Sequence, residues 1–328
     1  MSTPPRYAVV GTLCLDNVVA VDGTCYVGKP GGNVLWSAAG ARLWTGRLGV
    51  VARAGADYPA EPLARLAEAG VDLGGVTRTG EPHGLRIAYR HRADGGRDQP
   101  VPQEALGGLA PEQRAVFVDT TRDPAVRGRS DPAFTDIPAA WLDSVRLWHL
   151  PLLPLRLHRA IHAGLRAHGP ARIIADCPNR FEIGDLAADM AGTLPGLEAF
   201  LPSTSDLDVI SPGADGTLIA ADLAARGSGT VVLKQGAAGS LVVEGDGPRW
   251  QIPAYPSDVV DPTGAGDAFC GGFLVGLGET GDVVEAAARG AVSASYAVET
   301  ADPLAVLAAD PAGARTRLAH VKARITKA

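Results

Sequence analysis

The sequence predicts an α/β fold in which a doubly wound, mostly parallel central sheet is flanked by helices. One observation is a series of short, largely apolar runs, such as residues 7–10, 48–52 and 172–176. Runs of this kind are typical of strands buried on both faces of a parallel sheet. A second observation is that helical stretches, such as 155–168, stand between the runs, and this alternation requires crossover helices.

Two stretches depart from this pattern and predict a small β-sheet beside the main one. Residues 14–29 hold two short apolar runs around Asp22-Gly23, which is typical of a hairpin. Residues 85–90 alternate apolar and charged side chains, as in a strand with one face in water. We expect a small β lid formed by 14–29 and 83–114, and an α/β core formed by 5–13, 30–82 and 115–328.

Within the core, three further expectations follow from local composition. The run at 116–119 predicts a strand of the main sheet, and the segment 120–136, rich in Arg, Asp, Pro and Gly, predicts a long loop. His158 and His162 share a face of the predicted helix at 155–168, but the Glu of a zinc-binding H-E-x-x-H motif is absent. We therefore expect a solvent-facing histidine pair.

The charge and cysteine content of the 328-residue chain exclude several classes of protein. A net charge of −6 argues against a nucleic-acid or anionic-membrane partner. No apolar stretch reaches the roughly 18 residues of a membrane span. The four cysteines lie far apart, which indicates neither a disulfide framework nor a zinc site and suits a cytoplasmic location.

Residues 259–272 carry the chemistry on which the functional argument depends. An apolar, strand-like pair at 259–260 meets Asp261-Pro262, and a turn of small residues leads into a helix at Asp267. A glycine turn at a helix start is an anion site, because free N–H groups and the positive dipole end lie together. Asp267 would repel a phosphate there unless it takes a proton from the attacking group, and the dipole favours its ionised form.

This stretch closely resembles the C-terminal signature of the ribokinase-like (PfkB-type) carbohydrate and nucleoside kinases. The resemblance implies that Gly264, Ala265 and Gly266 form an anion hole and that Asp267 is the catalytic base. It also implies a ribokinase-like fold with a lid, and places Thr263 on the nucleotide side. The alternative is a glycine-rich turn with a capping aspartate.

The resemblance implies an acceptor site at the start of the chain. Asp16, just after the first strand, would hold sugar hydroxyls, and Gly31-Gly32 would lie beside the sugar. Many family members carry an Asn one turn beyond these glycines, where this chain has Leu35 or Trp36, so Asn33 would substitute for it. Asn33 is also a plausible helix N-cap, and Asp16 could be a turn residue instead. Asn179 lies in a loop that resembles a substrate-side loop of the family.

The nucleotide side is implied by two further segments. The turn Lys234-Gln-Gly236-Ala-Ala-Gly239 resembles the family's Thr-or-Lys-x-Gly-x-x-Gly turn, so Lys234, Gly236 and Gly239 would border the ATP phosphates. Ser203-x-x-Asp206 stands where the family has Asn-x-x-Glu, which implies that Asp206 helps to organise Mg²⁺. The alternatives are a strand-end lysine and a capping box.

These observations favour an ATP-dependent kinase that phosphorylates a hydroxyl of a sugar, a sugar acid or a nucleoside. A dinucleotide-dependent oxidoreductase is disfavoured because no G-x-G-x-x-G follows the first strand. A non-catalytic relative that only binds ligands is the other alternative, and the presence of Asp267 argues against it. An exposed lid edge would favour a homodimer through the lid.

Overall fold

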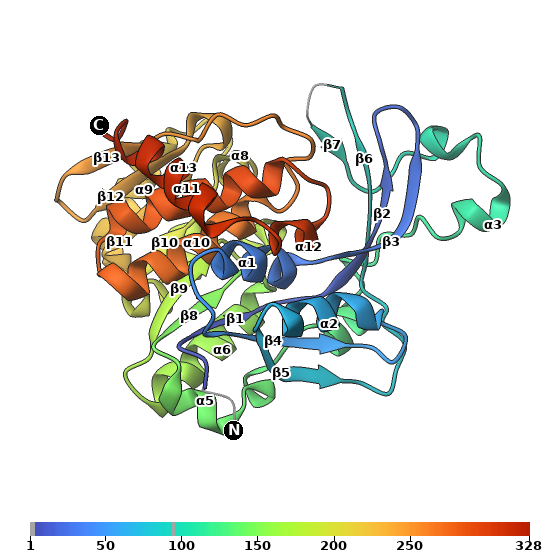
Figure 1. The fold of residues 1–328 in the computed structure, drawn as a ribbon, viewed down its shortest axis with the longest axis horizontal. Helices are drawn as coiled ribbons and strands as arrows, with labels where there is room; N and C mark the ends of the chain where they lie inside the picture. The colour runs from blue at the N-terminus through green and yellow to red at the C-terminus, as the bar shows by residue number, and fades with distance from the viewer. Residues whose placement is uncertain (1–3, 94–95) are drawn as a thin grey trace.

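The computed structural model describes residues 4–93 and 96–328, and within them a ten-stranded sheet is the largest element (Figure 1). The order across the sheet is β14 (Thr326–Lys327), β13 (Arg249–Ile252), β12 (Ser240–Glu244), β11 (Thr230–Lys234), β10 (Ala199–Leu201), β9 (Arg172–Asp176), β8 (Leu147–Leu150), β1 (Tyr7–Val10), β4 (Leu48–Ala54) and β5 (Asp72–Arg78). In this order, neighbouring strands between β11 and β5 pair in parallel, and β12, β13 and β14 extend the sheet by antiparallel pairing.

Helices cover both faces of this sheet, which confirms the predicted fold class. Alternate residues of β1 enter two different cores: Tyr7 and Val9 belong to one cluster, and Ala8 and Val10 to the other. Across the described residues, no helix combines the length and the apolar character needed to cross a bilayer. One face carries α1 (Asn33–Arg42), α2 (Ala60–Glu68), α10 (Ala265–Thr280), α11 (Val283–Val298) and α13 (Pro311–Lys322), and the other carries α5 (Ala139–Ser144), α6 (Leu155–His168), α7 (Leu186–Met190), α8 (Thr204–Ile210) and α9 (Gly216–Leu223).

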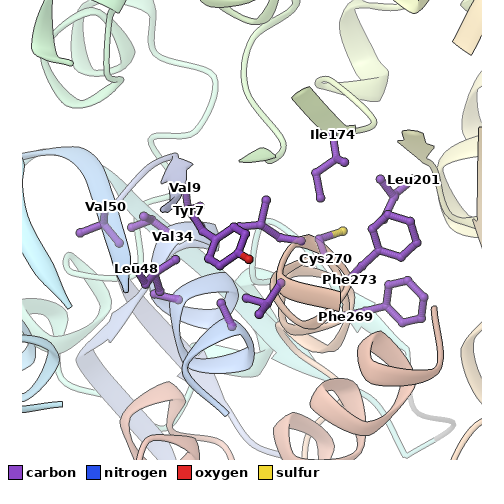
Figure 2. Close-up of a cluster of buried hydrophobic side chains, with 14 of the residues drawn as sticks. Tyr7, Val9, Val34, Leu48, Val50, Ile174, Leu201, Phe269, Cys270 and Phe273 are labelled. Atoms are coloured by element: carbon purple, nitrogen blue, oxygen red, sulfur yellow. The ribbon is translucent and has the colours of Figure 1, made fainter. Parts of the chain in front are cut away.

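Close packing against α1 fixes the position of α10. A β-carbon on Gly40 of α1 would lie 2.2 Å from the carbonyl oxygen of Ala268, and one on Gly271 would lie 2.0 Å from that of Ser37. Only glycine permits the two backbones to approach so closely. On the other side of α10, Phe273 packs toward the strand residue Leu201 (Figure 2). The first turn of α10 is therefore held between α1 and the strand ends.

A separate four-stranded sheet stands beside this body, near the short helix α12 (Pro303–Val306) (Figure 1). One face is covered by a small apolar cluster that includes Val19, Ala88 and Phe117. The other face carries Asp16 and Tyr89, which line a cavity against the main body. Its strand order is β3 (Cys25–Gly31), β2 (Cys14–Val19), β6 (Arg86–His91) and β7 (Arg97–Asp98), with β2 and β6 parallel and the outer pairs antiparallel.

The segment 115–136 differs from the sequence prediction. Residues 116–119 form no strand of the main sheet; Phe117 packs against the small sheet, and the carbonyl of Val116 accepts a hydrogen bond from Asn17 at 2.6 Å. The predicted loop at 120–136 contains α4 (Pro124–Ser130), which Asp123 caps by accepting from two backbone N–H groups. An Asp-Pro pair is a helix-start signal, and it was outweighed in the prediction by the charged composition. The short helix α3 (Pro111–Arg114) precedes this segment.

Two local expectations were also wrong. His158 and His162 lie in α6 as expected, but both are buried under the sheet rather than facing solvent. They share the inward face with Ile161 and Leu165, so the apolar neighbours set the direction of that face. Residues 259–260 form no strand, and both valines are exposed.

Candidate active site

The N-terminus of α10 forms a turn with free N–H groups. Gly264 is the N-cap, with φ 78° and ψ −3°, a left-handed conformation that favours glycine. Within residues 4–93 and 96–328, the backbone N–H groups of Gly264, Gly266 and Asp267 have no hydrogen-bond partner. Unpaired N–H groups at the positive end of a helix form a site for an anion. The helix begins at Ala265, two residues earlier than predicted.

The residues before this turn hold its shape and contact the small sheet. The carboxylate of Asp261 accepts a hydrogen bond from the N–H of Thr263 at 2.8 Å, and the carbonyl of Pro262 accepts from that of Ala265 at 3.3 Å. The Nε2 atom of His91, on β6, lies 3.3 Å from Asp261 Oδ2. The small sheet therefore contacts Asp261, shortly before the glycine turn.

Asp267 lies in the first turn of α10 and is partly buried. Burial raises the pKa of its carboxyl to about 7, and the Asp176 carboxylate acts in the same direction. Lys234 and Arg97 lower the pKa but do not cancel these effects. The helix dipole is a local feature visible in the sequence, whereas desolvation and the second carboxylate arise only in the fold. Near pH 7 the group can exist in either form, which suits a residue that accepts and then releases a proton.

Lys234 and Asp176 form a buried ion pair close to Asp267. The Nζ atom of Lys234 lies 2.8 Å from each carboxylate oxygen of Asp176 and 3.5 Å from the sulfur of Cys270. Burial by itself would lower the pKa of Lys234, but Asp176 and other acidic neighbours raise it above the ordinary lysine value. The lysine is therefore charged and fully engaged by protein groups.

The nucleotide-side turn follows Lys234 between β11 and β12. Gly236 and Gly239 both have positive φ, 57° and 90°. The N–H of Gln235 donates to the carbonyl of Gly239 at 2.8 Å, and a β-carbon on Gly239 would lie 2.0 Å from the carbonyl oxygen of Ile252. The turn thus requires glycine for its own geometry, and Gly236 leaves open space above it.

Asp206 occupies a capping box at the start of α8. Its Oδ2 atom accepts from the N–H and the hydroxyl of Ser203 at 2.9 and 2.6 Å, and its Oδ1 atom accepts from Arg180 at 3.2 Å. The structure shows no group of three or more His, Cys, Asp or Glu side chains, among the residues it describes, that could hold a metal ion. Both carboxylate oxygens of Asp206 therefore have protein partners.

Three of the acceptor-side residues predicted from the sequence, Asp16, Gly31 and Gly32, lie together where the small sheet meets α1. Asp16 lies on β2, and a β-carbon on Gly31 would lie 2.3 Å from its carboxylate. Burial raises the pKa of Asp16 to about 6, and this effect outweighs a hydrogen bond from the thiol of Cys14 that lowers the pKa. Gly32 is the N-cap of α1 with φ 108°. Asp16 and the Gly31-Gly32 pair are thus in direct contact.

A narrow cavity separates the small sheet from the main body. Its free volume of about 10 Å³ is close to what one water molecule needs. Lys29 closes one side by donating from Nζ to the carbonyl of Ala301 at 2.9 Å. Acidic, aromatic and hydroxyl groups line it together: Asp16, Asp261, Trp36, Tyr89 and Thr263.

Two predicted site residues are engaged elsewhere. Asn33 is not the N-cap of α1; its side chain accepts from the N–H of Thr12 at 2.8 Å and donates to the carbonyl of Leu152 at 2.7 Å. It braces two loops at the carboxyl edge of the sheet. Asn179 accepts from the N–H of Phe181 and donates to Glu182, so its amide shapes its own loop.

Comparison with known proteins finds sequence similarity to sugar and nucleoside kinases. Residues 177–307, which include Asp206, Lys234 and Asp267, match the pfkB family carbohydrate kinase family. The matched segment is thus similar to the PfkB-type kinases. A cytidine kinase from Thermococcus kodakarensis is 26% identical over 275 residues, which cover 82% of this chain and 87% of the relative.

Solved structures show that the chain has the ribokinase-like fold over almost its whole length. A structure from E. coli described as a ribokinase II, in complex with ATP and Mg²⁺, gives a TM-score of 0.71 at 16% identity and covers 96% of this chain and 99% of that one. Aminoimidazole riboside kinase from Salmonella enterica, in complex with aminoimidazole riboside and an ATP analogue, gives 0.68 at 18% identity, with 95% and 99% covered.

The structure brings further residues to this site that the sequence does not mark as part of it. Asp176 is the last residue of β9, and a polar residue at the carboxyl end of a parallel strand was an available signal. Tyr89 and His91 belong to the alternating strand of the small sheet, and only the packing of that sheet brings them to the cavity and to Asp261.

Proposed function

We propose that this kinase transfers the γ-phosphoryl group of ATP to a hydroxyl of a small acceptor, with Asp267 as general base and the Gly264–Gly266 turn as anion hole. The observation that supports this most directly is the position of Asp267 among unpaired backbone N–H groups. A carboxylate placed there can take the hydroxyl proton while the N–H groups stabilise negative charge on the transferring phosphoryl group.

The acceptor site is the cavity between the small sheet and the main body. Asp16, buried and in contact with Gly31, would accept hydrogen bonds from acceptor hydroxyls. Trp36 and Tyr89 supply two aromatic rings to the same cavity. Aromatic rings bind planar groups favourably, and a relative that matches most of the chain is a cytidine kinase. We therefore place a nucleoside first among the acceptors, ahead of a free sugar or a sugar acid.

The small sheet would act as the lid of this site. It contacts the main body through Lys29 at Ala301 and His91 at Asp261, and the cavity beneath it is too small for a nucleoside. Entry of the acceptor therefore requires the two parts to separate, and closure afterwards would exclude water as a competing acceptor.

The protein groups available for ATP phosphates are unpaired, whereas the carboxylate available for Mg²⁺ already has protein partners. The unpaired N–H groups of the glycine turn suit phosphate oxygens, and the turn after Lys234 would border the nucleotide through Gly236 and Gly239. Mg²⁺ commonly binds through substrate phosphates and water with one or two carboxylates. Asp206 would contribute through a bridging water, since Ser203 and Arg180 occupy its oxygens. The metal supplies charge neutralisation on the phosphates.

A phosphoryl-transfer assay over a panel of nucleosides, sugars and sugar acids tests the proposal. The protein is incubated with Mg-ATP and each acceptor, and both ADP and the phosphorylated acceptor are measured. We expect stoichiometric product with at least one nucleoside. Binding of ATP and acceptor without product would identify a non-catalytic relative, and product from a sugar but from no nucleoside would overturn the acceptor class alone.

A further inference from the structure

The ion pair between Lys234 and Asp176 lies beneath the glycine turn and takes no part in the transfer step described above. Both side chains are only 10% exposed. A β-carbon on Gly266 would lie 3.5 Å from the Nζ atom of Lys234. The ammonium group is thus buried between the end of β9 and the first turn of α10, where Asp267 resides.

The sheet itself fixes this pair in place. Asp176 ends β9 and Lys234 ends β11, and β10 lies between these two strands. The N–H of Lys234 donates to the carbonyl of Pro202, just after β10, at 2.9 Å. Parallel strands place their carboxyl ends at the same edge, which is where ligands bind in open α/β sheets. The pair is therefore a rigid part of the site and not a mobile surface contact.

We propose that Lys234 and Asp176 are positioning residues that set the charge state of Asp267 from opposite directions. The ammonium group favours the ionised carboxylate of Asp267, and the carboxylate of Asp176 restrains that effect. This inference rests on the proposed function, because it concerns the base of that reaction. It also assigns Lys234 a role other than direct contact with the nucleotide.

The surroundings of Asp267 support this arrangement. After burial, Asp176 is the largest influence that raises the pKa of Asp267, and Lys234 is the largest that lowers it. Two weaker influences on this pKa, Arg97 on β7 and Asp206 on α8, act in opposite directions.

The other titratable groups that pack against α10 are either neutral near pH 7 or paired with each other at the far end of the helix. Burial keeps the pKa of Cys270 well above its ordinary value and that of His149, on β8, well below it, so both are neutral near pH 7. On α11, Glu285 and Arg289 pair with each other near Gly276, toward the far end of α10. Apart from burial, Asp176 and Lys234 therefore have the largest effects on the pKa of Asp267.

The test compares Asp176→Asn with the double variant Asp176→Asn/Lys234→Met. These two proteins differ only at position 234, where Met lacks the ammonium group of Lys, and neither has Asp176 as an acid. We measure the acidic limb of the pH profile of kcat/KM, using Mg-ATP and the nucleoside that the panel identifies. The limb of Asp176→Asn should lie about one pH unit below that of the double variant, since an opposite charge at close range favours the ionised form by that amount or more. The variant Asp176→Asn/Lys234→Arg keeps a positive charge at position 234, so its acidic limb should lie at the same low pH as that of Asp176→Asn.

A substrate-free measurement accompanies the kinetics. The carboxyl carbon of Asp267 is titrated by NMR in the same three proteins, and the same order is expected. If Asp176→Asn is too unstable to study, the wild-type protein is compared with the double variant Asp176→Asn/Lys234→Met. The acidic limb of the double variant should lie at lower pH than that of the wild-type protein, because Asp176 raises the pKa of Asp267 more than Lys234 lowers it. Coincident titrations in every comparison would show that the pair only braces the sheet and would overturn the inference.

The failure of this inference can be told apart from failure of the proposed function. Asp267→Asn is measured in the same assay. If Asp267→Asn is as fast as the wild-type protein, the assignment of the base is wrong, whatever the limbs show. If Asp267→Asn is slow and the limbs nevertheless coincide, the base assignment stands and only the role of Lys234 and Asp176 is withdrawn.

Discussion

The indole ring of Trp36 occupies the space beside Gly264, so that a β-carbon on Gly264 would lie 2.1 Å from Cδ2 of the ring. Trp36 belongs to α1 and lines the acceptor cavity, and Gly264 caps the helix that carries Asp267. The wall of this cavity and the glycine turn are therefore in direct van der Waals contact.

This contact predicts different outcomes at the two glycines of the turn. Gly264→Ala places a methyl group inside the indole ring and keeps a left-handed backbone that costs about 1–2 kcal/mol for a residue other than glycine. We expect a lower melting temperature and loss of turnover. Gly266→Val meets only the end of Lys234, so the fold should survive while the valine side chain blocks the phosphoryl position. Thermal melts and steady-state turnover measure both effects.

A double variant checks the cause of the first effect. Trp36→Ala removes the clash but leaves the backbone cost. We therefore expect Gly264→Ala to lower the melting temperature less in the Trp36→Ala background than in the wild-type background. Equal penalties in both backgrounds would show that the ring contact has no part in the effect. Full turnover by folded Gly266→Val would remove the anion-hole assignment.

Asp267→Asn tests the general base. The amide keeps the size of the side chain but cannot accept the hydroxyl proton, and loss of a general base typically lowers the rate by ~10²–10⁴-fold. ATP affinity should be retained or slightly improved, because a negative charge beside the phosphates is removed. Single-turnover transfer and ATP binding are measured side by side. A variant that loses ATP binding but keeps its transfer rate would assign Asp267 to the nucleotide instead.

The pKa of Asp267 predicts the pH dependence of both rate and stability. Because its pKa is raised to about 7, the base is protonated below that pH, and kcat/KM should fall tenfold per unit on the acidic side. The folded protein holds this proton between about pH 4 and 7 while the unfolded chain does not, so this group makes stability decline as pH rises through that window. Asp267→Asn should therefore raise the melting temperature more at pH 8 than at pH 5. An equal change at both pH values would contradict the raised pKa.

Asp206→Ala tests the connection between α8 and Mg²⁺. We expect the Mg²⁺ concentration for half-maximal rate to rise severalfold, with a smaller change in the acceptor KM, if the carboxylate organises the metal through water. Ser203→Ala is the matched control, because it removes a partner of the same capping box and leaves the carboxylate. Identical magnesium titrations for the two variants and the wild-type protein would leave Asp206 as a helix cap only.

The edge of the small sheet predicts association between two copies of the chain. β3 is an edge strand, and Tyr26 and Val27 on it are exposed. Unpaired strand edges with apolar side chains favour pairing with another chain. Val27→Lys should shift the protein toward monomer in sedimentation velocity without lowering the melting temperature. A wild-type protein that is monomeric at micromolar concentration would end this prediction.

The sequence by itself determined the fold class and the signature turn. Continuous apolar runs predict buried parallel strands because each strand needs an apolar surface on both faces, and the alternating cores of β1 agree. The glycine turn before Asp267 was predictable for a related reason: helix starts and tight turns depend on residues adjacent in the chain. The strand expected at 116–119 was wrong because a short apolar run is equally suited to covering the small sheet.

Only the tertiary structure decided which charges meet. Three contacts join segments far apart in the chain. They are the ion pair of Lys234 with Asp176, the contact of Trp36 with Gly264, and the ion pair of Arg180 with Asp206. The raised pKa of Asp267 follows from burial and from Asp176, whereas the sequence displayed only the local helix dipole. Desolvation and Coulomb interactions depend on distance in space, and sequence separation carries no information about that distance until the chain has folded.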